Sequence, residues 1–198
     1  MTTDQTILYY NEHAKEFCTN TKDADMGACR DGFLNHLPDG ASILDSGCGS
    51  GRDAKAFEEK GYQVTAIDAA PEICKQAEQL LNHRVECISF QELNQQEEYD
   101  GIWACASLLH VSEEEMHDVI GRLWKALKRD GVLYASFKYG KTERIAHGRF
   151  FHDYDEQSLK KLMDENHFTV IDLYVTRDVR EDRADERWVN VLVRKEDK

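Results

Sequence analysis

The stretch ILDSGCGSGRD, residues 43–53, decides the fold, because a short apolar run ends here in three closely spaced glycines. Gly47, Gly49 and Gly51 permit positive φ angles and let a ligand approach the backbone closely. The apolar run predicts a strand and the residues after the glycines predict a helix. We therefore expect a ligand-binding loop at the carboxyl end of a strand.

Outward from this loop, strand-like and helix-like stretches alternate along the chain. Helical spacing at 4–19 and 24–37 predicts an N-terminal helical cap, and an apolar stripe predicts a helix over 113–129. The alternation predicts a doubly wound α/β fold, with a mostly parallel seven-stranded sheet and helices on both faces. Strands are expected at residues 42–44, 63–67, 84–89, 99–106, 132–138, 168–175 and 188–193.

The domain organisation follows from length and from the absence of a linker. The 198 residues contain no linker rich in Pro, Gly or Ser, and their number suits one hydrophobic core. We expect a single domain, 1–198, made of a helical cap (1–37), a cofactor-binding core (38–139), and a lid with a C-terminal hairpin (140–198). Segment 138–154 lacks periodicity, which predicts a loop lid. The charge run 177–187 predicts a solvated loop.

Composition limits the partners and the location. The formal net charge of −13 argues against nucleic acid, whose binding draws on clustered Lys and Arg. No apolar run is long enough for a membrane span, and the first residues lack the parts of a signal peptide, so we expect a cytoplasmic protein. The six cysteines have no metal-like spacing, which predicts reduced thiols and no metal. Composition leaves the oligomeric state open.

Two acids indicate which cofactor the loop binds. Asp68 ends the next strand, about 20 residues further on, where an acid accepts hydrogen bonds from a ribose diol. Asp45 stands two residues before Gly47 and would repel a pyrophosphate, but it suits the ammonium and sulfonium of S-adenosylmethionine. The spacing G-x-G-x-G also differs from the G-x-G-x-x-G of dinucleotide loops. We therefore expect S-adenosylmethionine as the cofactor.

Residues 40–137 resemble a class I methyltransferase, with its first motif at 44–51 and its aromatic-rich fourth strand in EYDGIWACASLLH, residues 98–110. The GRD at 51–53 is similar to small methyltransferases of the tellurite-resistance type. The resemblance implies that Asp68 binds the ribose and that Phe90 or Gln91 binds the adenine amino group. The expected cofactor-binding residues are Tyr10, Asp45, Gly47, Cys48, Gly49, Arg52, Asp68, Ala69, Phe90, Gln91 and Cys105.

Methyl transfer is an in-line displacement, so the protein mainly aligns the nucleophile and excludes water. We expect His110, Lys138 and Tyr139 to be the catalytic residues, because they follow the fourth and fifth strands; His110 is the candidate base.

A small-molecule acceptor is expected, because little chain lies outside the core and the net charge is acidic. One cation and aromatic walls suit a small anionic or planar acceptor, and the candidate substrate residues are Arg149, Phe150, Phe151 and Tyr154. A tRNA or protein methyltransferase and a non-catalytic S-adenosylmethionine-binding protein remain as alternatives.

Overall fold

The computed structural model describes residues 3–180 and 183–196, which are built around a seven-stranded sheet. The strand order is β3-β2-β1-β4-β5-β9-β8. The first five strands pair in parallel, whereas β9 is antiparallel to both β5 and β8. The doubly wound, mostly parallel sheet that the alternation predicts is therefore confirmed. The strands are β1 (Ser42–Ser46), β2 (Gln63–Asp68), β3 (Glu86–Cys87), β4 (Tyr99–Ala104), β5 (Leu127–Lys138), β8 (Phe168–Arg177) and β9 (Arg187–Lys195).

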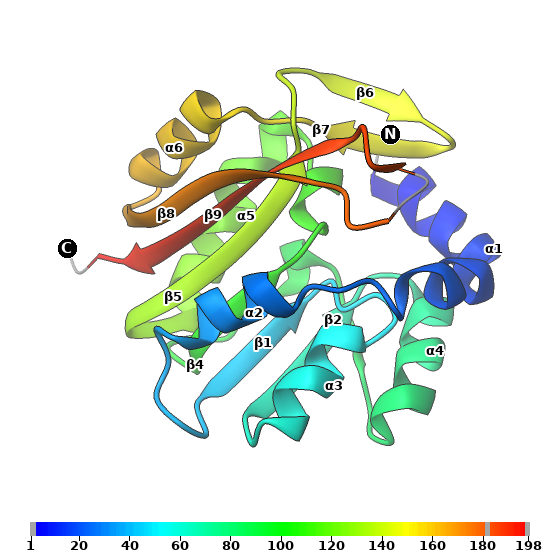
Figure 1. Cartoon of the computed structure of the whole chain (residues 1–198), viewed down its shortest axis with the longest axis horizontal. Helices are drawn as coiled ribbons and strands as arrows, with labels where there is room; N and C mark the ends of the chain where they lie inside the picture. The colour runs from blue at the N-terminus through cyan, green and yellow to red at the C-terminus, as the bar shows by residue number, and fades with distance from the viewer. Residues whose placement is uncertain (1–2, 181–182, 197–198) are drawn as a thin grey trace.

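Helices cover both faces of this sheet (Figure 1). Successive residues of β4 point to opposite faces, so Trp103 packs with Phe33 of α2 and Phe57 of α3, while Ile102 joins the cluster that contains Met116 of α5. Each face thus has its own apolar layer. The helices are α1 (Thr3–Thr21), α2 (Gly27–Leu34), α3 (Arg52–Glu59), α4 (Pro71–Leu81), α5 (Glu113–Ala126) and α6 (Glu156–Glu165). Among the described helices, none is both long and apolar enough to cross a membrane.

The carboxyl ends of the parallel strands meet at one edge of the sheet, and the segments that follow them gather there. Two of these segments are short 3₁₀ turns, η1 (Phe90–Glu92) after β3 and η2 (Leu108–His110) after β4. Because neighbouring parallel strands end together, chain segments far apart in sequence become neighbours at this edge.

Segment 138–154, expected as a loop lid, instead contains a β-hairpin of β6 (Glu143–Ala146) and β7 (Arg149–His152). The hairpin rests against α1: the backbone N–H of Phe150 donates to the hydroxyl of Thr6 at 3.0 Å. Figure 1 shows the hairpin above the main sheet, on the side where α1 lies. Strand pairing, which the missing periodicity did not reveal, orders the segment, and its role as a lid stays a prediction.

Two helix boundaries also differ from the expected ones. The helix expected over 113–129 ends at Ala126, because Leu127 pairs with Tyr99 as the first residue of β5. Lys128, expected in the last helical turn, instead forms an ion pair with Asp100 at 2.9 Å. The helix expected over 24–37 spans only Gly27–Leu34. Strand pairing at the sheet therefore overrides the helical pattern at the end of α5.

Candidate active site and cofactor pocket

The glycine loop follows β1 and turns into α3. Gly47, Gly49 and Gly51 all have positive φ angles, at +80°, +56° and +79°. A Cβ on Gly47 would lie 2.4 Å from the Cβ of Ser107, so no other residue fits there without displacing the chain after β4. The backbone N–H of Gly47 and that of Cys48 both donate to the carbonyl of Ile67, at 2.9 Å each. The loop is thus held against the end of β2.

Asp68 lies at the end of β2 and is connected to this loop. Its carboxylate accepts the N–H of Gly49 at 3.1 Å and the N–H of Ala70 at 3.0 Å. Burial raises the pKa of this carboxyl, and the backbone hydrogen bonds oppose the rise. Asp68, Ala69, Phe90 and Gln91 together line a cavity of about 100 Å³, which we call the nucleoside cavity.

The hydrogen bonding of the Gln91 amide shows whether this cavity suits a nucleoside. Its Nε2 donates to the carboxylate of Glu115 at 3.0 Å, which orients the amide. Its Oε1 is buried and has no hydrogen-bond partner among the described residues. A buried acceptor without a donor is costly, and a ligand amino group such as that of adenine would satisfy it. The residues present therefore fit the nucleoside part of S-adenosylmethionine.

A second cavity, of about 850 Å³, is also lined by residues of the glycine loop, and we call it the acceptor cavity. Asp45, Cys48, Arg52 and Cys105 line it. Asp45 is only 2% exposed, and burial, with a further contribution from Asp53, raises its pKa well above the ordinary value. A cationic group bound beside this carboxyl would relieve the cost of its ionisation.

Cys48 and Cys105 do not behave as nucleophiles in this setting. Cys48 belongs to a buried apolar cluster, and burial raises the pKa of its thiol. Burial likewise raises the pKa of Cys105 to about 12. Both thiols stay protonated at neutral pH, so they act as small apolar walls. Across residues 3–180 and 183–196, no three His, Cys, Asp or Glu side chains converge to hold a metal.

The two cavities meet at six residues that line both of them: Tyr10, Phe17, Gly47, Gly49, Ala106 and His110. The sequence places these residues on three separate segments, but the structure brings them together at the end of β1. A ligand that spans both cavities must pass this junction, so the junction is where a reacting group between them would lie.

His110 is oriented at the junction by two hydrogen bonds. Its Nδ1 lies 2.6 Å from the carbonyl oxygen of Phe150, which only accepts, so Nδ1 carries the proton. Nε2 is then an acceptor, and the hydroxyl of Tyr10 donates to it at 2.9 Å. Burial lowers the pKa of His110 to about 4, and the Phe150 carbonyl opposes this shift. His110 is therefore neutral near pH 7.

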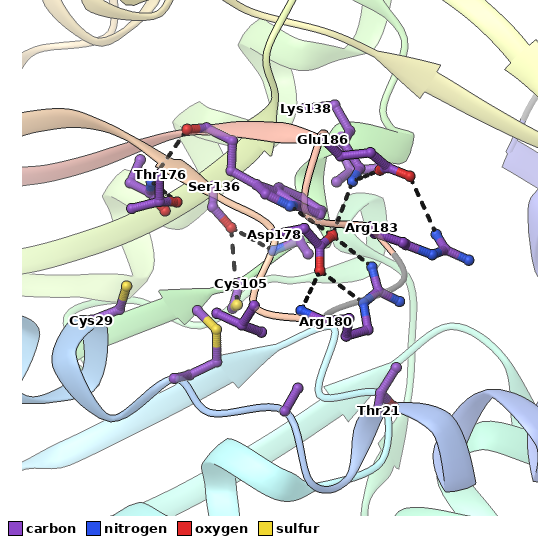
Figure 2. Close-up of a pocket in the computed structure, with 18 of the residues that line it drawn as sticks. Thr21, Cys29, Cys105, Ser136, Lys138, Thr176, Asp178, Arg180, Arg183 and Glu186 are labelled. Carbon is purple, nitrogen blue, oxygen red and sulfur yellow. Dashed lines mark hydrogen bonds and ion pairs between the residues drawn. The ribbon is translucent and has the colours of Figure 1, made fainter.

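Lys138, expected as a catalytic residue, lines the acceptor cavity but is held by acids (Figure 2). It forms ion pairs with Asp178, at 3.3 Å, and with Glu186. Asp178 also accepts from Arg180 at 2.8 Å and from the indole of Trp188 at 3.0 Å. The positive charge of Lys138 is thus balanced by the carboxylates of Asp178 and Glu186, which belong to segment 177–187.

The charge of segment 177–187 predicts a solvated loop, but described residues of this segment instead line the acceptor cavity. Asp178 is buried, and the segment supplies several residues to the wall of the acceptor cavity. Asp178 and Glu186 are lining residues of this cavity that were not among the predicted site residues. One signal could have found them: charges that alternate in sign next to Trp188, since an aromatic residue in a charged run indicates contact with the fold.

The other expected site residues divide between the cavity wall and the core. Arg149 and Phe151 line the acceptor cavity, and so does Tyr139, whose hydroxyl donates to Glu156 at 3.0 Å. That hydrogen bond raises the pKa of Tyr139. Phe150 and Tyr154 are buried and line neither cavity. Phe150 instead contributes its backbone to Thr6 and His110.

Comparison with known proteins agrees with this geometry. A family model described as "Methyltransferase domain" matches residues 43–131. A ubiquinone biosynthesis O-methyltransferase from Xanthomonas campestris pv. campestris is 32% identical over 104 residues, which are 49% of this chain and 43% of that protein. The chain thus spans less than half the length of this relative.

Solved structures extend the likeness to nearly the whole chain. The 1,6-didemethyltoxoflavin-N1-methyltransferase of Burkholderia thailandensis, solved with S-adenosylhomocysteine, has a TM-score of 0.80 at 26% identity and covers 98% of this chain and 88% of its own. The [4+2]-cyclase SpnF, at 18% identity with a TM-score of 0.74, covers 98% and 96% and shows the fold alone. These comparisons show that residues 43–131 match a methyltransferase domain and that the chain has the fold of a solved methyltransferase over nearly its whole length.

Proposed function

We propose that this chain transfers a methyl group from S-adenosylmethionine to a small-molecule acceptor. The meeting of two cavities at Gly47 and Gly49 carries the proposal. The smaller cavity suits a nucleoside, and the larger one, of about 850 Å³, has room for an acceptor beside the methionine part. Methyl transfer needs such a junction, because the nucleophile must approach the methyl carbon in line with the departing sulfur.

The chain's residues divide the work of holding the cofactor, which supplies a methyl group on positively charged sulfur. Asp68 would accept from the ribose hydroxyls, and Gln91 Oε1 would accept from the adenine amino group. Asp45 would face the cationic methionine part. The bound S-adenosylhomocysteine of the Burkholderia thailandensis enzyme supports the choice of cofactor.

An acceptor hydroxyl or amine must also lose a proton, and the pair Tyr10–His110 would receive it. The unprotonated ring nitrogen of His110, Nε2, accepts a hydrogen bond from the Tyr10 hydroxyl at 2.9 Å. We therefore infer that the proton of the acceptor passes to the Tyr10 oxygen while the proton of Tyr10 passes to Nε2. His110 would act as a base through Tyr10, which the sequence alone does not indicate.

The chemical type of the acceptor is supported only coarsely. The Xanthomonas relative is an O-methyltransferase of ubiquinone biosynthesis, and the Burkholderia enzyme was solved with 1,6-didemethyltoxoflavin bound. The tellurite-resistance type depends on the GRD motif, whose Asp53 is bonded to Arg30, Arg52 and Trp103. An organic acceptor is therefore the better-supported class.

Calorimetric titration with S-adenosylmethionine and with NADH tests the function. We expect binding of the first ligand only, weakened about tenfold or more by Asp68→Ala, because charge-assisted hydrogen bonds are lost. Asp100→Ala is the matched control, because Asp100 is an acid of β4 that pairs with Lys128 and lines neither cavity. Tighter binding of NADH than of S-adenosylmethionine would contradict the proposal. Absence of S-adenosylhomocysteine formation across an acceptor panel would favour a non-catalytic binding protein.

A further inference from the structure

The acceptor cavity concentrates cations in a chain whose formal net charge is −13. Six acids line it, but more Arg and Lys residues do. A concave site with an excess of one charge raises the local concentration of ligands of the opposite charge. The cationic lining residues are Arg52, Lys138, Arg144, Arg149, Arg177, Arg180, Arg183 and Arg187.

Most of these cationic lining residues form ion pairs with Asp or Glu side chains. Arg52 pairs with Asp53, Arg144 with Asp153, and Arg180 with Asp178, all within 2.8 Å. Their charges are therefore committed to the structure of the protein. A ligand that competed for them would first have to break these pairs.

Arg149, like Arg177 and Arg187, forms no ion pair with an Asp or Glu in the described part of the chain, but it differs from them in its contact with Tyr10 at the junction. Its Nη1 donates to the Tyr10 hydroxyl at 3.4 Å, a long hydrogen bond to a neutral group. Its Nε is buried and has no hydrogen-bond partner among the described residues. An anion that accepts two parallel N–H hydrogen bonds binds favourably to a guanidinium group without a carboxylate partner.

The guanidinium of Arg149 is also held in place by aromatic rings. Its Cζ lies 4.9 Å from the ring centre of Tyr9, 5.8 Å from that of Tyr10 and 5.2 Å from that of Phe151. The backbone of the next residue, Phe150, is tied to Thr6 and to His110. Such preorganisation lowers the entropy lost when a ligand binds.

Arg149 lines the acceptor cavity but not the nucleoside cavity, and it lies next to the junction through Tyr10. We propose that Arg149 recognises an anionic group on a small planar acceptor, whose ring lies against Phe151 and whose nucleophile faces the junction. This inference rests on the proposed function and names the class of its substrate. Because Arg149 bonds Tyr10 and Tyr10 bonds His110, one small molecule can present its anionic group to Arg149 and its nucleophile to the junction.

Calorimetry on the S-adenosylhomocysteine-loaded protein tests this, with hydroxybenzoates and aminobenzoates as anionic probes and their amides as neutral matches. We expect the acids to bind about tenfold more tightly than the amides, as for one charge-assisted pair. Arg149→Gln should abolish the preference. Arg144→Gln should keep it, because Arg144 also lines the cavity and lies 4.7 Å from Phe151 but is paired with Asp153.

Three results would overturn the inference: no acid binds, the amides bind equally well, or the preference survives Arg149→Gln. A large loss of S-adenosylhomocysteine affinity in Arg149→Gln would also overturn it, because Arg149 would then bind the carboxylate of the cofactor itself. Failure of the proposed function is distinguishable, since the unaltered protein would then not bind S-adenosylmethionine at all.

Discussion

Asp45 is a buried carboxyl whose proposed part in cofactor binding would come at the expense of stability. The carboxyl is 2% exposed, and burial together with Asp53 raises its pKa, so its ionised form is disfavoured in the folded protein. A group with a raised folded pKa contributes stability below its unfolded pKa and loses it as pH rises through the folded value. Asp45 therefore weakens the free protein at neutral and higher pH, while a cationic ligand gains from it.

We predict opposite effects of Asp45→Asn on stability and on binding. The melting temperature of the ligand-free variant should rise by a few degrees at pH 8, because no buried charge has to form. Its affinity for S-adenosylmethionine should fall and lose the increase with pH that we expect of the unaltered protein. Thermal unfolding and calorimetry at pH 6 and pH 8 measure both effects. A lower melting temperature would mean that the buried N–H groups of the asparagine amide cost more than the removed charge, since its oxygen can still accept from the Ala54 N–H.

The sequence predicts the positions of some site residues and not of others. The difference depends on how far apart in sequence the contacting residues are. Gly47 and Asp68 belong to a local strand-turn-helix pattern with a recognisable spacing, so their placement could be predicted. The contact between Lys138 and Asp178 joins residues 40 positions apart, and no spacing announces it. The orientation of His110 similarly depends on Tyr10, which is 100 residues away.

The β6–β7 hairpin illustrates the same limit for a secondary-structure element. Its strands alternate too weakly in hydrophobicity to be recognised, and its order comes from pairing between 143–146 and 149–152 and from contact with α1. At the turn, Gly148 has φ of +74°, and a Cβ there would lie 3.1 Å from Cδ2 of Tyr9. Both the turn and its closeness to α1 therefore require glycine.

We predict that Gly148→Ala loosens the hairpin by about 1 kcal/mol, because alanine is strained at positive φ and presses on Tyr9. Hydrogen exchange of residues 143–152 should accelerate, most clearly at the Phe150 N–H that donates to Thr6. Gly121→Ala is the matched control: Gly121 lies in α5, a Cβ there meets nothing within 4 Å, and alanine favours helix. Equal exchange rates in the two variants would show that the contact with Tyr9 has no structural weight.

In the molecule as a whole, the cofactor site is assembled from parts that are distant in sequence. Tyr10 and Phe17 come from α1, the glycine loop from the sheet, and His110 is tied to the hairpin through Phe150. Each part contributes residues to the junction or holds one of them. A ligand that bridges the cavities must therefore stabilise α1 and the hairpin together with the sheet, although neither belongs to the sheet itself.

Hydrogen exchange with and without S-adenosylhomocysteine tests this coupling. At a ligand concentration 100 times the Kd, binding stabilises the bound form by about 2.7 kcal/mol, which slows about 100-fold any exchange that requires the site to open. We expect this slowing in α1 and in the β6–β7 hairpin. The control is α6, which packs on β8 and lines neither cavity, so its locally exchanging amides should change little. If the hairpin kept its rate while α1 slowed, the hairpin would be a neighbour of the cofactor site and not a part of it. The path from Arg149 to His110 would then lose its structural basis.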